Sequence, residues 1–118
     1  MRPANVFVAG GTDDDIVHGI AREFGVLAQA DIIDRQPPGS ILETTLGNIV
    51  VTRSVPGLMP EFDRYPINLV IDAGDNDGNE RLMRAVVGAA TALGLSAVAV
   101  FDYELDYTVA RTPDVAAE

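Results

Sequence analysis

Two acidic loops carry the residues of this chain best suited to bind a ligand or a metal ion. They occur in the segments VFVAGGTDDD, residues 6–15, and LVIDAGDNDG, residues 69–78. Each segment is an apolar run that stops at Ala-Gly and then opens into a loop with several carboxylates. In α/β proteins, ligands bind at loops that follow strands in this way. Both loops are therefore candidate sites.

We expect a small ligand to contact Gly10, Gly11 and Thr12 in the first loop and Asp72 and Asp75 in the second. A helix N-terminus after the glycines would attract an anion. However, aspartates at residues 13–15 would fill its first turn. Their charges disfavour a phosphate there unless a cation intervenes.

A metal site is conditional on how the strands pair. Asp13, Asp72 and Asp102 each follow an apolar run. If the sheet is parallel, the three carboxylates meet at one edge and could hold Mg²⁺ or Ca²⁺. An EF-hand is excluded, because its pattern would place Ala73 and Arg84 at ligand positions. The sequence does not establish a cofactor. If the three carboxylates form a site, we expect it to bind Mg²⁺ or Ca²⁺.

The composition excludes several kinds of chemistry. The chain has 118 residues, a formal charge of −10, no Cys and one His, and its eight basic residues are all Arg. Without Lys or Cys there is no Schiff base, P-loop lysine or thiolate nucleophile. A single His does not make a multi-His zinc site. The negative charge disfavours binding to nucleic acid or to a membrane surface.

Apolar runs and turn residues predict the elements that position these loops. A buried strand over 5–9 leads to a helix over 13–24, with Thr12 as N-cap and Gly25 just past its end. A second strand is expected over 26–33. Gly47-Asn48 is typical of a hairpin turn between strands at 41–46 and 49–53, and the proline-rich residues 54–66 predict a long loop.

The second half repeats the order of strand, helix and strand. We expect a strand over 67–72, a helix over 79–93 ending at Gly94, and a strand over 96–101. Residues 101–107 alternate between apolar and acidic, which predicts a half-exposed continuation of that strand. A helical turn capped by Asp102 is the alternative.

These elements predict a single α/β domain over residues 1–111 and a flexible C-terminal tail over 112–118. The expected sheet is mixed and largely parallel, built from two β-α-β units plus a central β-hairpin, with two main helices. A ferredoxin-like α+β arrangement with antiparallel strands is the alternative.

One stretch resembles a known family. Val87-Gly88-Ala89-Ala90-Thr91-Ala92-Leu93-Gly94 is similar to the helix–strand segment of nucleoside deoxyribosyltransferase-like folds, and Val6-Phe7-Val8-Ala9-Gly10 is similar to their opening strand. The resemblance covers a small part of the chain and implies a nucleoside-type substrate. That family carries a nucleophilic glutamate just before the helix glycine, where this chain has Val86 and Val87.

The sequence therefore leads to two hypotheses about function. The first is a non-catalytic small-ligand-binding or assembly protein, homo-oligomeric through residues 101–107 or through a small-residue helix face at Ala85, Gly88, Ala89 and Ala92. The second is a carboxylate- or Mg²⁺-dependent enzyme or sensor acting on a small molecule such as a nucleoside derivative. We expect a cytoplasmic protein, because the first residues lack the apolar region of a signal peptide.

Overall fold

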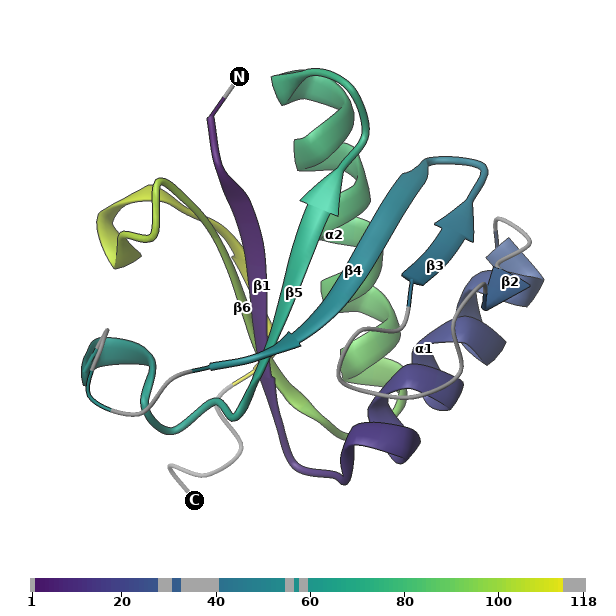
Figure 1. The fold of residues 1–118 in the computed structure, drawn as a ribbon, viewed down its shortest axis with the longest axis horizontal. Helices are drawn as coiled ribbons and strands as arrows, with labels where there is room; N and C mark the ends of the chain where they lie inside the picture. Colours follow the sequence, from purple (N-terminus) through teal and green to yellow (C-terminus); the bar gives the residue numbers. More distant parts are fainter. Residues whose placement is uncertain (1, 28–30, 33–40, 55–56, 58–59, 114–118) are drawn as a thin grey trace.

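The computed structural model describes residues 2–27, 31–32, 41–54, 57 and 60–113 (Figure 1). Its helices are α1 (Asp13–Leu27) and α2 (Asn76–Ala92), with two short 3₁₀ turns, η1 (Pro60–Phe62) and η2 (Leu105–Tyr107). Its strands are β1 (Ala4–Ala9), β2 (Asp31–Ile32), β3 (Ile41–Thr44), β4 (Gly47–Arg53), β5 (Ile67–Asp72), β6 (Ser96–Phe101) and β7 (Thr108–Arg111). Neither helix of this part of the chain is long and apolar enough to cross a membrane.

The described strands form one sheet in the order β2-β3-β4-β5-β1-β6-β7. A single α/β domain with two main helices is confirmed. The strand directions correct the largely parallel sheet that the sequence suggested, because β1 lies between β5 and β6 and pairs antiparallel with both. In the second β-α-β unit, β1 lies between β5 and β6, as in the ferredoxin-like alternative. In the first unit, the three strands β3, β4 and β5 lie between β1 and β2.

Both helices cover the same face of the sheet (Figure 1). Alternate strand residues point into this helical layer, and the main core consists of apolar side chains such as Val6, Val8, Leu69, Ile71, Ala97 and Ala99 packed on Ile16, Ile20, Phe24, Leu82 and Val86. Their burial removes apolar surface from water and provides most of the driving force for folding. Neither α-helix of the described chain packs on the opposite face of the sheet, which is covered by the segment that contains η1.

A second apolar cluster lies on the face that carries no helix. Phe62 of η1 stacks on Phe7 of β1, with ring centroids 4.0 Å apart and planes at 7°. Tyr65, Val98 and Val100 complete the cluster. The segment from η1 to β5 is thereby fixed over the middle of the sheet.

The helix ends differ from those the sequence predicted. The predicted N-cap of α1 is confirmed, because the Thr12 hydroxyl accepts a hydrogen bond from the Asp15 amide at 3.1 Å. Gly25 does not end α1, which continues to Leu27. α2 begins at Asn76, earlier than expected, because the Asp75 carboxylate accepts a hydrogen bond from the Gly78 amide at 2.6 Å. Gly94, with φ of 74°, ends it as predicted.

Three strand predictions also needed correction. The β3–β4 turn is Thr45-Leu46, because Thr44 pairs with Gly47. β2 contains only Asp31–Ile32 of the predicted strand over 26–33, of which residues 28–30 and 33 lie outside the described residues. β6 ends at Phe101, and residues 102–107 form a turn and η2 instead of a longer strand.

Candidate functional site

The two acidic loops lie at opposite ends of the sheet. β1 and β5 are antiparallel, so the loop after β1 leaves one end and the loop after β5 leaves the other. β6 is also antiparallel to β1, which places Asp102 at the same end as Asp72. Asp13 begins α1 at the far end. The structure therefore does not bring Asp13, Asp72 and Asp102 together as a metal site requires, and the described residues contain no cluster of three or more possible metal ligands.

Several predicted ligand-binding groups already have partners within the chain. Thr12 and Asp75 cap the two helices. The Asp72 carboxylate accepts a hydrogen bond from the Gly74 amide at 3.2 Å. At Gly10 and Gly11 a side chain would lie 3.5 Å from Leu95. These residues hold their loops in shape, and a ligand would have to compete for the same groups.

Asp102 is paired as well. Its carboxylate lies 2.9 Å from the Arg2 guanidinium. The Arg2 guanidinium in turn lies over the rings of Phe101 and Tyr107, at 4.7 and 4.8 Å from their centroids. These contacts join the N-terminus to the β6–β7 connection.

One hollow of about 380 Å³ adjoins the N-terminus of α2. Its lining residues are Thr45, Leu46, Ala73, Asp75, Asp77, Gly78 and Arg81. Of the residues predicted to bind a ligand, it contains Asp75, whose carboxylate caps the helix. The lining carries both signs of charge, so it selects no ligand charge strongly.

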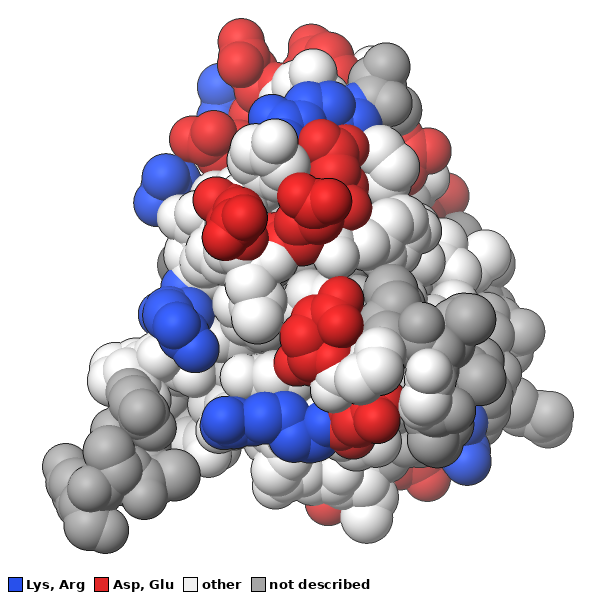
Figure 2. Space-filling view, turned by 90° about the vertical axis from the view of Figure 1, so that its left-hand side faces the viewer, with Lys and Arg blue, Asp and Glu red and all other residues white. Residues whose placement is uncertain are grey.

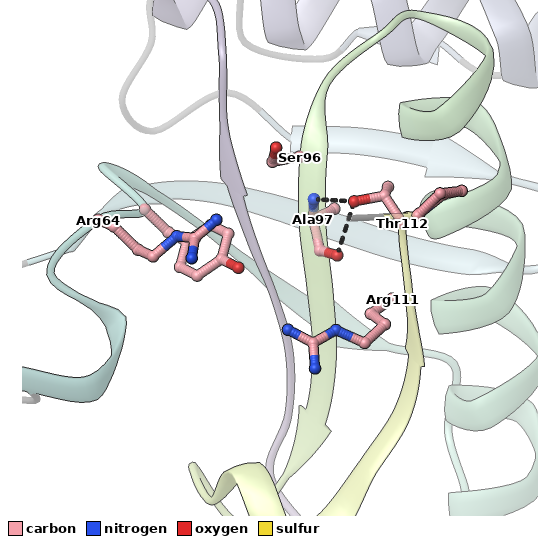
Figure 3. A pocket seen from close by; sticks show the side chains of 7 residues that line it. Arg64, Ser96, Ala97, Arg111 and Thr112 are labelled. Atoms are coloured by element: carbon pink, nitrogen blue, oxygen red, sulfur yellow. Dashed lines mark hydrogen bonds between the residues drawn. The ribbon is translucent and has the colours of Figure 1, made fainter. Parts of the chain in front are cut away.

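The described residues that line a second pocket include two positively charged side chains and no negatively charged one. It measures about 30 Å³ and is lined by Arg64, Tyr65, Ser96, Ala97, Arg111, Thr112 and Pro113. Figure 3 shows Arg64 on the left of the view and Arg111 on the right below Ala97 and Thr112, with Ser96 above them. None of the acidic residues that the structure describes lines this pocket, so this part of an acidic chain offers a local site for an anion.

Arg64 is positioned by the apolar cluster around Phe62. The Tyr65 amide donates to the Phe62 carbonyl at 2.9 Å. The Arg64 guanidinium lies 5.0 Å from the centroid of the Tyr65 ring, within the range of a cation–π contact. The neighbouring Asp63 carboxylate accepts a hydrogen bond from the Gly57 amide at 3.0 Å. The acid nearest in sequence to Arg64 is therefore already bonded elsewhere.

Arg111 is positioned by the pairing of β7 with β6. It lies opposite Val98, whose side chain belongs to the cluster on the helix-free face. Thr112, which the sequence assigned to the tail, is buried and fixes the end of β7. Its hydroxyl accepts a hydrogen bond from the Ala97 amide at 3.0 Å, and its own amide donates to the Ala97 carbonyl at 2.9 Å. Residues 114–118 of the predicted tail lie outside the described residues.

Neither guanidinium of this pocket has an anionic partner in the described part of the chain. The ion pairs found there join Arg2 to Asp102 and Arg84 to Glu80. Figure 2 shows acidic and basic side chains interspersed over one side of the molecule. Both arginines are exposed, so an anion from solution can reach them.

The sequence did not identify this pocket. Arg64 and Arg111 belong to no motif and come together through the Phe7–Phe62 stack and the β6–β7 pairing. The sequence has Arg and no Lys, but this composition does not indicate which arginines share a pocket.

Comparisons with protein-family models, with curated proteins and with solved structures find no match for this chain.

Proposed function

We propose that this protein is a non-catalytic binding protein for a small anion, carrying a carboxylate or phosphate group, that binds between Arg64 and Arg111. The observation that carries the proposal is the lining of the pocket, in which the described residues provide two guanidinium groups and no acidic side chain. Planar guanidinium groups match the oxygen geometry of carboxylate and phosphate, and their hydrogen bonds to these anions are among the strongest in proteins.

Electrostatics favours occupation of this pocket by an anion. Two positive charges that border one small space repel each other, and a bound anion removes this repulsion. The Ser96 hydroxyl and the Tyr65 side chain add polar atoms to the lining. A volume of about 30 Å³ suits one charged group, since sites that enclose a whole drug-sized ligand measure about 300–1,000 Å³. The pocket would hold the charged end of a ligand and leave the remainder exposed.

The same lining supports binding over catalysis. A serine nucleophile needs a general base within hydrogen-bonding distance. His18, the one histidine of the chain, lies exposed on α1, on the helical side of the sheet. The Thr112 hydroxyl is engaged by Ala97. Arg64 and Arg111 can orient an anion and neutralise it, which is the chemistry of binding.

Thermal unfolding in the presence of anions tests the proposal. Inorganic phosphate and acetate are titrated separately at constant ionic strength, with chloride as the reference anion. A ligand at ten times its Kd stabilises the folded state by about 1.4 kcal/mol, which corresponds to a rise in Tm of about 6 °C for a domain of this size. The two anions distinguish a phosphate site from a carboxylate site.

Variants assign the effect to the pocket. Arg64→Gln and Arg111→Gln should each reduce the rise in Tm, because each removes one guanidinium from the lining. Arg22→Gln is the matched control, since Arg22 is exposed on α1 away from the pocket. The proposal is refuted if neither anion gives a saturable rise, or if the rise persists in both pocket variants.

A further inference from the structure

The hairpin tip, which we define as residues 102–107 between β6 and β7, is a second unpartnered surface. The exposed large hydrophobic side chains of the described residues are all in it, namely Tyr103, Leu105 and Tyr107, with 40%, 44% and 48% of their surface accessible. Glu104 and Asp106 alternate with them and form no ion pair within the described part of the chain. Apolar side chains concentrated at one exposed place mark an interaction surface.

The hairpin tip is held in one conformation before any partner arrives. Asp102 and Tyr103 both have φ of 57°, a left-handed conformation that side chains rarely adopt. The Arg2 guanidinium pairs with Asp102 and lies over the Tyr107 ring. The Thr108 hydroxyl donates to the Leu105 carbonyl at 2.6 Å. A preorganised surface loses less conformational entropy on binding than a flexible one.

The hairpin tip and the Arg64–Arg111 pocket lie at opposite ends of β6. The tip follows Phe101 at the end of this strand, and the pocket includes Ser96 at its beginning. Figure 1 shows η2, in yellow-green, at the upper left of the molecule. A six-residue strand spans about 20 Å. Within the described part of the chain, Glu104 and Asp106 form no ion pair with Arg64 or Arg111 of the same molecule.

We infer that the hairpin tip of one copy of this chain docks on the Arg64–Arg111 pocket of a second copy. This inference rests on the proposed function, since it assigns the bound carboxylate to Glu104 or Asp106. Charge complementarity favours a second copy. Among the described residues, Glu104 and Asp106 of the tip form no ion pair, and those that line the pocket offer two guanidinium groups and no carboxylate. Tyr103 and Tyr107 can also lie against a guanidinium, as Tyr107 already does with Arg2.

Such a contact joins two different surfaces and is head-to-tail. It leaves a free tip at one end and a free pocket at the other, so further copies can add unless a ring closes. The net charge of −10 on every copy opposes association. We therefore expect a reversible contact that depends on protein concentration.

Complementary variants test the head-to-tail contact. Glu104→Gln with Asp106→Asn neutralises the tip, and Arg64→Gln with Arg111→Gln neutralises the pocket. Each double variant alone should associate at least about tenfold more weakly than the wild type, because each loses charge-assisted hydrogen bonds. An equimolar mixture should regain association, since it contains one intact tip and one intact pocket. That complex should stop at two copies.

Sedimentation velocity over a concentration series measures these outcomes, with thermal unfolding of each variant to confirm the fold. Phosphate at saturating concentration should dissociate wild-type assemblies by competing for the pocket. A wild-type protein that stays monomeric while it binds phosphate overturns this inference and leaves the proposed function intact. Absence of both phosphate binding and association overturns both. Association that survives in either double variant alone also overturns the head-to-tail contact.

Discussion

Removal of the Phe62 ring should disturb the fold and the anion pocket together. Phe62 is 1% exposed and stacks on Phe7 at 4.0 Å. Buried Phe→Ala substitutions cost about 3–5 kcal/mol. Phe62 belongs to the smaller of the two apolar clusters, on the face without helices, where a loop can partly close the space. We therefore expect a loss near about 3 kcal/mol for Phe62→Ala, at the lower end of that range.

The loss of stability translates into a measurable change in Tm. Globular domains unfold with an entropy of about 2.1 cal/mol/K per residue. For 118 residues, a loss of 3 kcal/mol then lowers Tm by about 12 °C. The substitution should also weaken phosphate binding by about tenfold, because Arg64 loses its fixed position and with it one charge-assisted contact. Calorimetric titration well below the new Tm measures this second effect.

Phe24→Ala is the matched control. Phe24 is fully buried on α1 and belongs to the core on the helical face. Its removal should lower Tm by a similar amount and leave the Kd for phosphate unchanged. If Phe62→Ala and Phe24→Ala have the same effect on the Kd, the stack does not position Arg64 and the reasoning is wrong. Phe62→Leu provides a milder variant in case Phe62→Ala is too unstable to titrate.

Four further predictions concern two glycines, the N-cap of α2 and the acidic loops. Gly25→Ala should raise stability by about 0.5–1 kcal/mol in urea unfolding, because Gly25 lies within α1 and an added Cβ meets nothing within 4 Å; a loss of stability would mean that α1 ends there. Gly47→Ala should instead destabilise by more than about 1 kcal/mol, since Gly47 has φ of 144° and the new Cβ would lie 2.8 Å from Ala73; an unchanged urea midpoint would contradict this close approach. Asp75→Ala should cost about 1 kcal/mol as a lost N-cap, with unchanged amide exchange in the first turn of α2 as the contrary result. Mg²⁺ should cause no saturable rise in Tm, and a rise that Asp72→Asn abolishes would show that a metal site exists after all.

Local patterns predicted the two helices and the strands up to β6, because these depend on neighbouring residues, but they did not predict β7. The apolar periodicity of residues 79–93 marked α2, and Thr12 marked the start of α1. The prediction that α1 ends at Gly25 was wrong. A helix that packs through Phe24 can continue past a glycine, because a glycine within a helix costs only a modest amount of stability. Local sequence constrains the residue at which a helix ends only weakly, and tertiary packing determines that residue.

The direction of strand pairing was not contained in those local patterns. A run such as Val6-Phe7-Val8 is apolar on both sides, and the structure covers one side with helices and the other with Phe62. Such a run is compatible with a parallel or an antiparallel sheet. Once β1 pairs antiparallel with β5, the two acidic loops separate and the predicted metal site loses its geometry.

The candidate anion site depended even more on tertiary structure. Arg64 is held by a stack between rings of η1 and β1, and Arg111 by the clamp between Thr112 and Ala97. Neither contact involves neighbours in sequence. The alternation over 101–107 did indicate an exposed amphipathic segment, although the backbone there forms a turn and η2 in place of a strand.

The most direct test of an anion bound between Arg64 and Arg111 is NMR observation of the arginine Nε–H signals during a phosphate titration at constant ionic strength. Signals assigned through Arg64→Gln and Arg111→Gln should shift together and saturate with one Kd, while the Arg22 signal stays in place. Shifts that are linear and equal for all exposed arginines, with no saturation at Arg64 and Arg111, would contradict the proposed site.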